Sequence, residues 1–327
     1  MTTYVLGAGA SRHAGYPLCS ELWASLAMWV IESQPQDSEY RQAIDTVSVL
    51  HGPVVDTEGV FTDLDLRRGA FRALTDDQRN KLMGGIRRCL CDYFKSVCNQ
   101  QRKASRYEAL ASRIQRGDVI VTFNYDVSLE NVLIRAHKFR VRDGYGFEAD
   151  WDEPDSDVKV LKLHGSINWI GVLFGGATEG TSVFSDSLGP RPFVDNVDSV
   201  LPGYPDCVLD KTFPCGGVTG GSTTLVLPTY EKKYSVTTSV GVEWIRFYES
   251  LWSQAAESLQ QSDRVVIIGY SMPEADHRSR ALLLWCNNKR AEVLLCCANS
   301  NETLKRSFET HGFWRVHEIG AFETAFV

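Results

Sequence analysis

The stretch Tyr4-Val5-Leu6-Gly7-Ala8-Gly9-Ala10-Ser11 joins a short apolar run directly to a glycine turn. Glycines placed after a strand let the backbone turn tightly and approach a pyrophosphate, while the next helix directs its free N–H groups at the anion. We expect Gly7, Ala8 and Gly9 to bind the phosphates of a nucleotide in this way. The pattern also fits an ordinary strand-to-helix turn, since Arg12 replaces the third glycine of the usual dinucleotide fingerprint.

Two further polar clusters follow apolar runs in the same manner. Phe123-Asn124-Tyr125-Asp126 comes after Val119-Ile120-Val121, and Leu163-His164-Gly165-Ser166 comes after the run 158–161. Ligands of an open parallel sheet bind outside the carboxyl ends of its strands, so the three clusters are expected to converge on one cleft. The sequence therefore predicts a nucleotide site that contains Asn124, Asp126 and His164.

Strand-like and helix-like segments alternate along the chain. The periodicity predicts strands at 3–6, 119–123, 158–163, 264–268, 292–298 and 314–319, and helices at 17–33, 104–116, 127–137, 241–260, 275–287 and 301–310. Strands that are separated by helices favour a parallel sheet with helices on both faces. We therefore predict an α/β fold, a doubly wound Rossmann-like parallel sheet.

Two insertions interrupt this alternation within a single domain over 1–327. The segment 35–102 is predicted to be mostly helical, and the apolar residues of its last helix, Leu82, Ile86, Leu90 and Phe94, share one face. The segment 171–223 is rich in glycine pairs and prolines and is predicted to be a loop-rich insertion. Loops of this length are functional lids, partner surfaces or disordered segments, and the sequence leaves these alternatives open.

The composition is that of a globular protein, with 43% hydrophobic and 23% charged residues among 327. A net charge of -7 argues against a dedicated nucleic-acid surface. The nine cysteines are scattered and never at Cys-x-x-Cys spacing, which indicates buried thiols in a reducing compartment and no structural zinc. No apolar stretch reaches the roughly 18 to 20 residues of a membrane span, and no signal-peptide pattern opens the chain. We expect a cytoplasmic protein with no metal, no membrane contact and no direct nucleic-acid binding.

Four motifs in register resemble the sirtuin superfamily. They are Gly7 to Ser11 with Gly15-Tyr16-Pro17 behind it, Thr122 to Asp126, Lys162 to Ser166, and Ile268-Gly269-Tyr270-Ser271. The resemblance runs in order from about Gly7 to Asn299, and it is closest to the bacterial sirtuin-like domains that hydrolyse NAD in antiphage defence. It implies that NAD is the ligand and that the insertion 35–102 is a helical subdomain lying over the cleft.

The chain also departs from the sirtuin deacylases. Their Gly-Ile-Pro is followed by Asp-Phe-Arg, whereas Gly15-Tyr16-Pro17 is followed here by Leu18-Cys19-Ser20. Phe123 stands where those enzymes have Gln, and their zinc module with two Cys-x-x-Cys pairs after the His-Gly is missing. These departures speak against peptide deacylation and leave the NAD-cleaving core.

The chemistry of nicotinamide release gives roles to three side chains. Positive charge builds on the ribose as the neutral pyridine leaves. Asn124 can hydrogen-bond a ribose hydroxyl or the attacking water, and Asp126 can accept from the carboxamide or favour the positive charge, as the sirtuin likeness also implies. His164 is the candidate base, since an imidazole titrates at a pH of about 6.5. A His before a Gly at a strand end also fits a packed core residue.

Further positions are expected to bind other parts of NAD. Ser11 can donate to a phosphate, although a Ser at a helix N-terminus also serves as a cap. Gly269 and Ser271 fit an adenosine-side phosphate loop, or a plain turn with Asp276 as the cap of the next helix. Asn299 suits a hydroxyl of the adenine ribose in the resemblance.

Two functions from different classes remain open. The first is an NAD glycohydrolase that cleaves NAD to nicotinamide and ADP-ribose and depletes NAD in antiphage defence. The second is a module of a larger defence assembly that binds or senses NAD or ADP-ribose with little turnover. A residual deacylase or ADP-ribosyltransferase activity is a third alternative. Since no sensor domain is apparent in the sequence, we expect control by homo-oligomerisation or by a separately encoded partner, such as a ring ATPase or a phage trigger protein.

Overall fold

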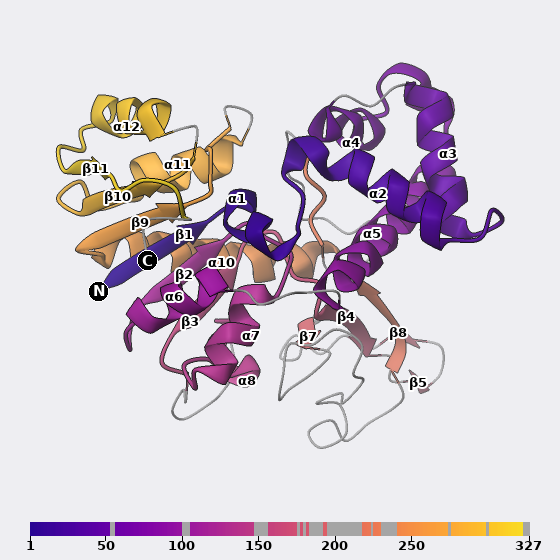
Figure 1. Cartoon of the computed structure of the whole chain (residues 1–327). Coiled ribbons are helices and arrows are strands. Elements are labelled where there is room, and N and C mark those ends of the chain that lie inside the picture. The colour runs from indigo at the N-terminus through magenta and orange to yellow at the C-terminus, as the bar shows by residue number, and fades with distance from the viewer. Residues whose placement is uncertain are drawn as a thin grey trace.

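The computed structural model describes residues 1–52, 56–99, 105–146, 156–174, 177–178, 181–182, 192–194, 218–223, 225–229, 241–273, 276–298 and 301–322. A six-stranded sheet forms the centre of the molecule, and a group of helices stands beside it (Figure 1). Among these described residues, no helix combines the length and the apolar character that crossing a membrane requires.

Each strand of the central sheet runs parallel to its neighbours. The strands are β1 (Thr2–Leu6), β2 (Val119–Thr122), β3 (Lys159–Lys162), β9 (Arg264–Ile268), β10 (Glu292–Cys296) and β11 (Val316–Glu318). Their order is β11-β10-β9-β1-β2-β3. The chain therefore winds outward from β1 to β3 and then continues on the other side of β1, which is the doubly wound order. This order confirms the predicted fold class.

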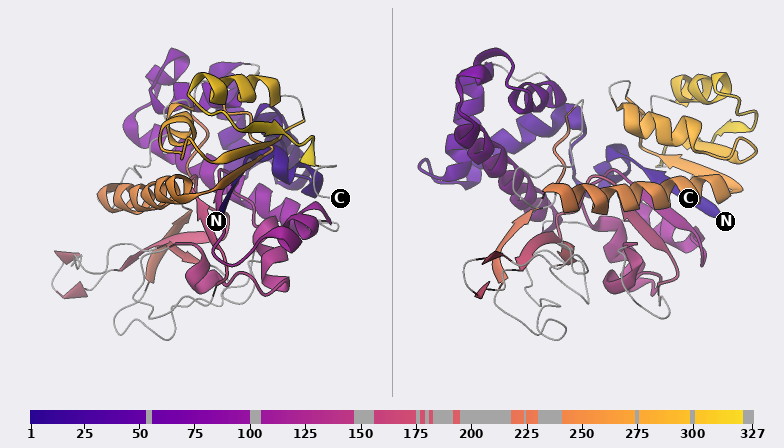
Figure 2. Two further views of the ribbon diagram at one scale, coloured as in Figure 1. Left: turned by 90° about the vertical axis from the view of Figure 1, so that its left-hand side faces the viewer. Right: turned by 180° about the vertical axis from the view of Figure 1, so that it is seen from behind.

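Helices cover both faces of the sheet. In Figure 1, α6 (Ser105–Arg113) and α7 (Ser128–Arg135) lie in front of β2 and β3, and the reverse view in Figure 2 shows α10 (Gly241–Gln261) crossing the opposite face. Further along the chain, α11 (His277–Trp285) contacts α10, and α12 (Asn301–Thr310) packs on β10 and β11. Strands covered on both faces are apolar along their length, and Val5, Ile120, Val160 and Ile267 are accordingly fully buried.

The helices beside the sheet form one group, which we call the helical subdomain. It consists of α2 (Cys19–Ser33), α3 (Glu39–His51), α4 (Thr57–Asp65), the 3-10 turn η2 (Gly69–Ala73) and α5 (Asp76–Asn99). The apolar stripe expected on α5, Leu82 to Phe94, is buried and joins the hydrophobic core. The sequence assigned α2 to the first strand–helix unit, but this helix packs on α3, α4 and α5 and belongs to the subdomain.

The glycine turn is followed by only one turn of helix, α1 (Ala8–Ser11), and then by the 3-10 turn η1 (Arg12–Ala14). This turn ends at Gly15, whose φ of +93° lies in the left-handed region that glycine tolerates. Leu18 is extended and precedes α2. The long helix expected next to the glycine turn is therefore separated from it, and only short α1 follows the turn directly.

The described parts of the predicted loop-rich insertion contain regular strands. β4 (Trp169–Phe174) lies between β7 (Pro192–Val194) and β8 (Val218–Thr223) in a three-stranded antiparallel sheet. A second antiparallel pair joins β5 (Ala177–Thr178) to β6 (Thr181–Ser182). The rest of the range 171–223 lies outside the described residues.

Candidate nucleotide site

The glycine turn lies at the switch point of the sheet, where β1 and β9 are neighbours. The N–H of Gly7 donates to the carbonyl of Ile268 at 3.0 Å, and the N–H of Gly9 donates to the carbonyl of Gly269 at 2.9 Å. A Cβ on Gly7 would lie 2.7 Å from the carbonyl oxygen of Gly269, and one on Gly269 would lie 2.1 Å from the Ala10 nitrogen. The glycines therefore allow two strand-end loops to pack backbone against backbone. The N–H groups of Gly7 and Gly9 therefore already have acceptors within the protein. Phosphate binding by Gly7, Ala8 and Gly9 remains a prediction.

Ser11 is the centre of a polar cluster at the carboxyl ends of β1 and β2. Its Oγ donates to Oδ2 of Asp126 at 2.5 Å and lies 2.7 Å from the hydroxyl of Tyr107. Since the one proton of Ser11 goes to Asp126, the Tyr107 hydroxyl donates to Ser11. Nδ2 of Asn124 donates to Oγ of Ser11 at 3.0 Å and to the carbonyl of Gly7 at 2.9 Å. The structure thus brings together three of the predicted site residues, Ser11, Asn124 and Asp126.

The amide of Asn124 is held in one orientation by this cluster. Both hydrogens of its Nδ2 are used, so Oδ1 is the group that it offers to a ligand. Asn124 is half-buried, whereas Ser11 and Asp126 are buried. Oδ1 of Asn124 can therefore accept a hydrogen bond from a ribose hydroxyl or a water. The sequence had left open whether this side chain donates or accepts.

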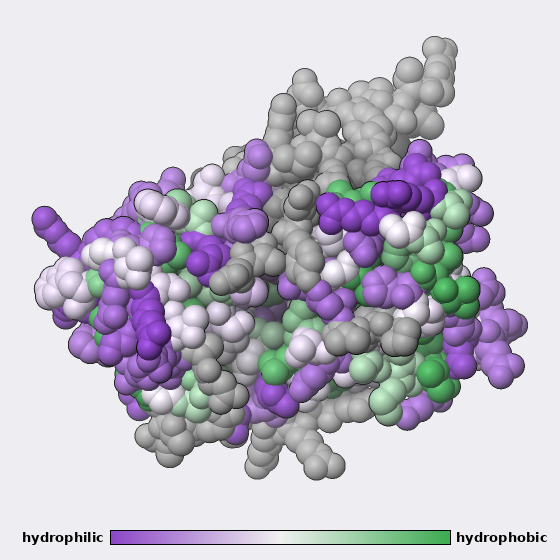
Figure 3. Space-filling view, turned by 90° about the horizontal axis from the view of Figure 1, so that it is seen from above, coloured by the Kyte–Doolittle hydropathy of each residue, from purple (hydrophilic) through white to green (hydrophobic). Residues whose placement is uncertain are grey.

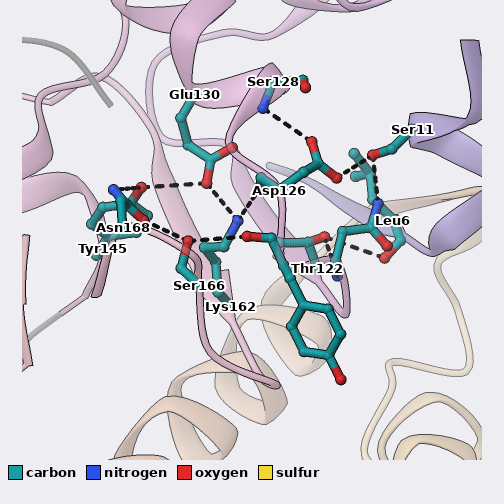
Figure 4. A network of polar contacts seen from close by, with 12 residues as sticks. Leu6, Ser11, Thr122, Asp126, Ser128, Glu130, Tyr145, Lys162, Ser166 and Asn168 are labelled. Atoms are coloured by element: carbon teal, nitrogen blue, oxygen red, sulfur yellow. Dashed lines mark hydrogen bonds and ion pairs between the residues drawn. The ribbon is translucent and has the colours of Figure 1, made fainter. Parts of the chain in front are cut away.

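Asp126 is 4% exposed, and both of its carboxylate oxygens have partners inside the protein. Oδ2 accepts from Ser11, and Oδ1 accepts from the N–H of Ser128 at 3.0 Å, at the start of α7 (Figure 4). Burial, and then the charge of Asp126, raise the pKa of Tyr107 well above its ordinary range, so this phenol stays a neutral donor. Contact of Asp126 with the carboxamide of NAD remains a prediction.

His164 lies in a group of aromatic rings at the ends of β2, β3 and β9. The residue is 6% exposed, and its ring centroid is 5.1 Å from that of Phe123. Phe123 in turn stacks on Tyr270 at 4.6 Å. The carbonyl of His164 accepts from the N–H of Val226 at 3.0 Å. Both a catalytic role and a packed-core role were expected for His164 as alternatives, and the base role remains a prediction.

The loop after β9 carries the predicted adenosine-side residues. Gly269 packs against the glycine turn, with a φ of +59°, and Ser271 is exposed. The side chain of Asp276 accepts from the N–H of Ser279 at 3.2 Å and caps α11, as the alternative interpretation of this loop expected. Asn299 lies outside the described residues, so its role is a prediction only.

A buried ion pair beneath the cluster was not identified from the sequence. Nζ of Lys162, the last residue of β3, donates to Oε1 of Glu130 at 2.7 Å and to the carbonyl of Asp126. The two side chains are 1% and 3% exposed. A lysine in the apolar run 158–163 was the available signal, because a strand buried on both faces has no ordinary place for a charge.

Polar contacts continue from this pair to the loop after His164. Oε1 of Glu130 accepts from the Tyr145 hydroxyl at 3.3 Å, and Nδ2 of Asn168 donates to the same hydroxyl at 3.1 Å. Ser166 donates to Oδ1 of Asn168 at 2.5 Å (Figure 4). Burial raises the pKa of Glu130, and the attraction of Lys162 opposes this shift.

Helix α5 packs against the same strand-end loops from the side of the helical subdomain. Phe94 meets Tyr125 with ring centroids 5.6 Å apart, and Sγ of Cys91 lies 3.5 Å from the carbonyl of Ile167. Arg87 lies one turn before Cys91. Its Nε is buried, and within the described part of the chain Arg87 forms no hydrogen bond or ion pair. Burial lowers the pKa of Arg87, and the charge of Asp65 opposes this shift.

The described residues hold no group of three or more His, Cys, Asp or Glu side chains that could bind a metal ion. Seven of the nine cysteines are among the described residues, and all seven are free thiols. Cys207 and Cys215 lie outside these residues. The absence of zinc therefore stays a prediction.

No protein-family model matches the chain, and no curated protein matches it. The solved structures that are similar to it include two of Sir2. One is a structure of Sir2 enzymes, with a TM-score of 0.41 and 13% identity over 99% of this chain and 88% of that chain. The other is Sir2 in complex with an inhibitor, 2'-O-acetyl-ADP-ribose and a deacetylated peptide, with a TM-score of 0.33 and 11% identity over 96% of this chain and 95% of that chain. The assignment of the fold class rests on the strand order and register given above.

Proposed function

We propose that this protein is an NAD glycohydrolase, which cleaves NAD to nicotinamide and ADP-ribose. The observation that carries the proposal is the fixed amide of Asn124, whose Oδ1 is offered at the carboxyl edge of the sheet next to the switch point. Nucleotides bind at this place in doubly wound sheets. The order of the four sequence motifs is the second support, since it resembles that of NAD-cleaving sirtuin-like domains.

The reaction needs a held ribose, a water and a base. Oδ1 of Asn124 would accept a hydrogen bond from a ribose hydroxyl or from the water. The buried carboxylate of Asp126 places a negative charge beside the amide, which favours the positive charge that builds on the ribose. His164 would take a proton from the attacking water or from a ribose hydroxyl, since an imidazole can act as a base at neutral pH. No metal has a role in this scheme.

The test of the base is the release of nicotinamide from NAD by the parent and by His164→Ala. The variant is expected to be slower by roughly two orders of magnitude or more, the scale of an acid–base group, and to bind ADP-ribose as the parent does. His317→Ala is the control, because this exposed histidine lies on the edge strand β11. A His164→Ala variant that cleaves NAD at the parent rate would show that the base assignment is wrong.

A binding module for NAD or ADP-ribose with little turnover is the second candidate. The near-complete burial of His164 among aromatic rings favours it, because a base must reach the proton that it takes. Calorimetry with ADP-ribose and the nicotinamide assay separate the two functions. A protein that binds ADP-ribose and releases no nicotinamide is the module and not the hydrolase.

We further propose that cleavage depletes NAD in the cytoplasm as part of antiphage defence. The support is the sequence resemblance to bacterial sirtuin-like defence domains. Control would come from homo-oligomerisation or from a separately encoded partner, such as a ring ATPase or a phage trigger protein. Light scattering of the purified chain, alone and with a candidate partner, together with the cleavage rate of each species, tests this part. A monomer of full activity that no partner changes would contradict it.

A further inference from the structure

The buried pair of Lys162 and Glu130 needs a reason beyond stability. Two charges that leave water lose hydration, and hydrophobic side chains of similar volume usually stabilise a core as well or better. Both side chains are almost completely buried, and their atoms are 2.7 Å apart. Figure 4 shows that the ammonium group of Lys162 lies between the carboxylate of Glu130 and the turn that carries Asp126.

Lys162 connects the two loops that hold the proposed catalytic groups. It is the last residue of β3 and stands two residues before His164. Its Nζ donates to the carbonyl of Asp126, which stands two residues after Asn124. One ammonium group therefore links the loop of the proposed base to the loop of the amide that would hold the ribose.

A second route joins the same loops. From the loop of His164, the contacts run through Ser166, Asn168 and Tyr145 to the carboxylate of Glu130, and the N–H of Ile167 donates to the carbonyl of Tyr125 at 3.0 Å. Glu130 lies in the first turn of α7, directly after the Asn124–Asp126 turn. The contacts form a closed set in which neither loop can shift without breaking a buried hydrogen bond, which costs free energy.

We propose that Lys162, paired with Glu130, is a positioning residue that sets the relative placement of Asn124 and His164. The proposal rests on the proposed NAD cleavage for its kinetic consequence. Positioning acts strongly on rate, because a misplacement of about 1 Å at a reacting group can lower turnover by about 100-fold. The ammonium touches neither ligand nor reacting atoms in this scheme, and it acts through the carbonyl of Asp126.

Two single variants separate positioning from plain stability. Both Lys162→Met and Glu130→Gln break the buried ion pair, but only Lys162→Met removes the donor to the carbonyl of Asp126. We expect Lys162→Met to lower kcat about 10- to 100-fold with KM changed less than about threefold. Glu130→Gln keeps the link and is expected to retain a kcat at least about tenfold above that of Lys162→Met.

A double variant and a control protect the test from a folding failure. Lys162→Met with Glu130→Leu removes both charges, and it is expected to fold because a hydrophobic pair replaces a buried ion pair. Its kcat should match that of Lys162→Met. The control is Arg264→Met with Glu292→Leu, which removes the ion pair at 2.8 Å between β9 and β10 at the opposite end of the strands and should leave kcat unchanged.

Hydrogen exchange gives a readout that does not depend on NAD cleavage. The amides of Phe123, Asn124 and Ser128 are bonded within the turn or to β1. In the double variant their exchange should be at least about tenfold faster, while exchange in β9 and β10 stays at the parent rate. A double variant with the parent kcat, or with unchanged exchange in this turn, would overturn the positioning role. A parent that releases no nicotinamide would overturn the proposed function alone, and the exchange result would still decide the role of Lys162.

Discussion

The carboxyl edge of the sheet and the helical subdomain differ in the hydrogen-bond acceptors that they provide for a buried cation. At the sheet edge, the ammonium of Lys162 has two acceptors, Oε1 of Glu130 and the carbonyl of Asp126. In α5, the buried Nε of Arg87 has no hydrogen-bond partner among the residues that the structure describes. The first region gives a buried ammonium two hydrogen-bond acceptors, whereas the second leaves a buried guanidinium nitrogen without an acceptor among the described residues.

Other features of the helical subdomain also cost stability. Gly84 and Gly85 lie in the middle of α5, where glycine weakens a helix. Met28, Ile31 and Val49 are exposed on α2 and α3, and Figure 3 shows green, hydrophobic side chains over this end of the molecule. Features that cost stability are typical of a part that moves or meets a partner, whereas the sheet edge is built to hold side chains in place.

Lys162→Met should give the largest loss in stability. It leaves the carboxylate of Glu130 buried without its cation, which is expected to lower the free energy of unfolding by about 3 to 5 kcal/mol in denaturant titrations. The pKa of Glu130, already raised by burial, should then rise further in the folded protein. The folded state would bind the proton more tightly than the unfolded state, so the variant should lose stability as the pH rises from the ordinary range of Glu toward this raised pKa. A variant as stable as the parent at neutral pH would show that the buried carboxylate of Glu130 does not need Lys162.

Gly269→Ala should give the second largest loss. A Cβ there would lie 2.1 Å from the Ala10 nitrogen, and the φ of +59° disfavours other residues. We expect a loss of about 2 to 4 kcal/mol, measured by chemical unfolding. Gly312→Ala is the matched control, because its φ of +88° is similar and a Cβ would meet nothing within 4 Å. Equal losses at the two glycines would show that backbone strain alone acts and that the packing of the two loops contributes nothing.

Arg87→Met should stabilise the protein, in contrast to Lys162→Met. The variant removes a cation whose buried Nε has no hydrogen-bond partner among the described residues, and a gain of about 1 to 3 kcal/mol is expected from this relief. Arg88→Met is the neighbouring control. Arg88 is exposed and pairs with Glu39, so its loss should change stability by less than about 1 kcal/mol. If Arg87→Met unfolds more easily than the parent, Arg87 stabilises the fold as Lys162 does, and the two regions do not differ in this respect.

Gly85→Ala should give the smallest effect, a gain of about 0.5 to 1 kcal/mol in the free energy of unfolding, measured by chemical unfolding. The added Cβ would meet Oε1 of Glu39 at 3.5 Å and Cβ of Ala43 at 3.8 Å, which are ordinary contacts. The opposite signs expected at Gly85 and Gly269 would sharpen the contrast between the two regions. A destabilised Gly85→Ala would show that α5 is packed as tightly as the sheet edge.

The fold and part of the site could be predicted from the sequence, because strand ends in parallel sheets meet at one edge. That rule brought Ser11, Asn124 and Asp126 together, and the hydrogen bonds between them are found in the structure. Lys162 and Glu130 were missed since the partners stand 32 residues apart, and only the folded chain shows that one charge faces the other. The membership of α2 in the helical subdomain was missed for the same reason. The periodicity of a helix predicts which of its faces is buried, but it does not predict which other element packs on that face.

The proposed NAD cleavage at Asn124 is tested by the release of nicotinamide from NAD, followed side by side for the parent, Asn124→Ala and Asn131→Ala. Asn131 lies on α7, half-buried, and serves as the matched control. We expect that the parent releases nicotinamide, that Asn124→Ala is slower by roughly two orders of magnitude, and that Asn131→Ala stays within about twofold of the parent. A parent that binds ADP-ribose but releases no nicotinamide, or an Asn124→Ala variant that matches the parent rate, would contradict the proposed NAD cleavage at Asn124.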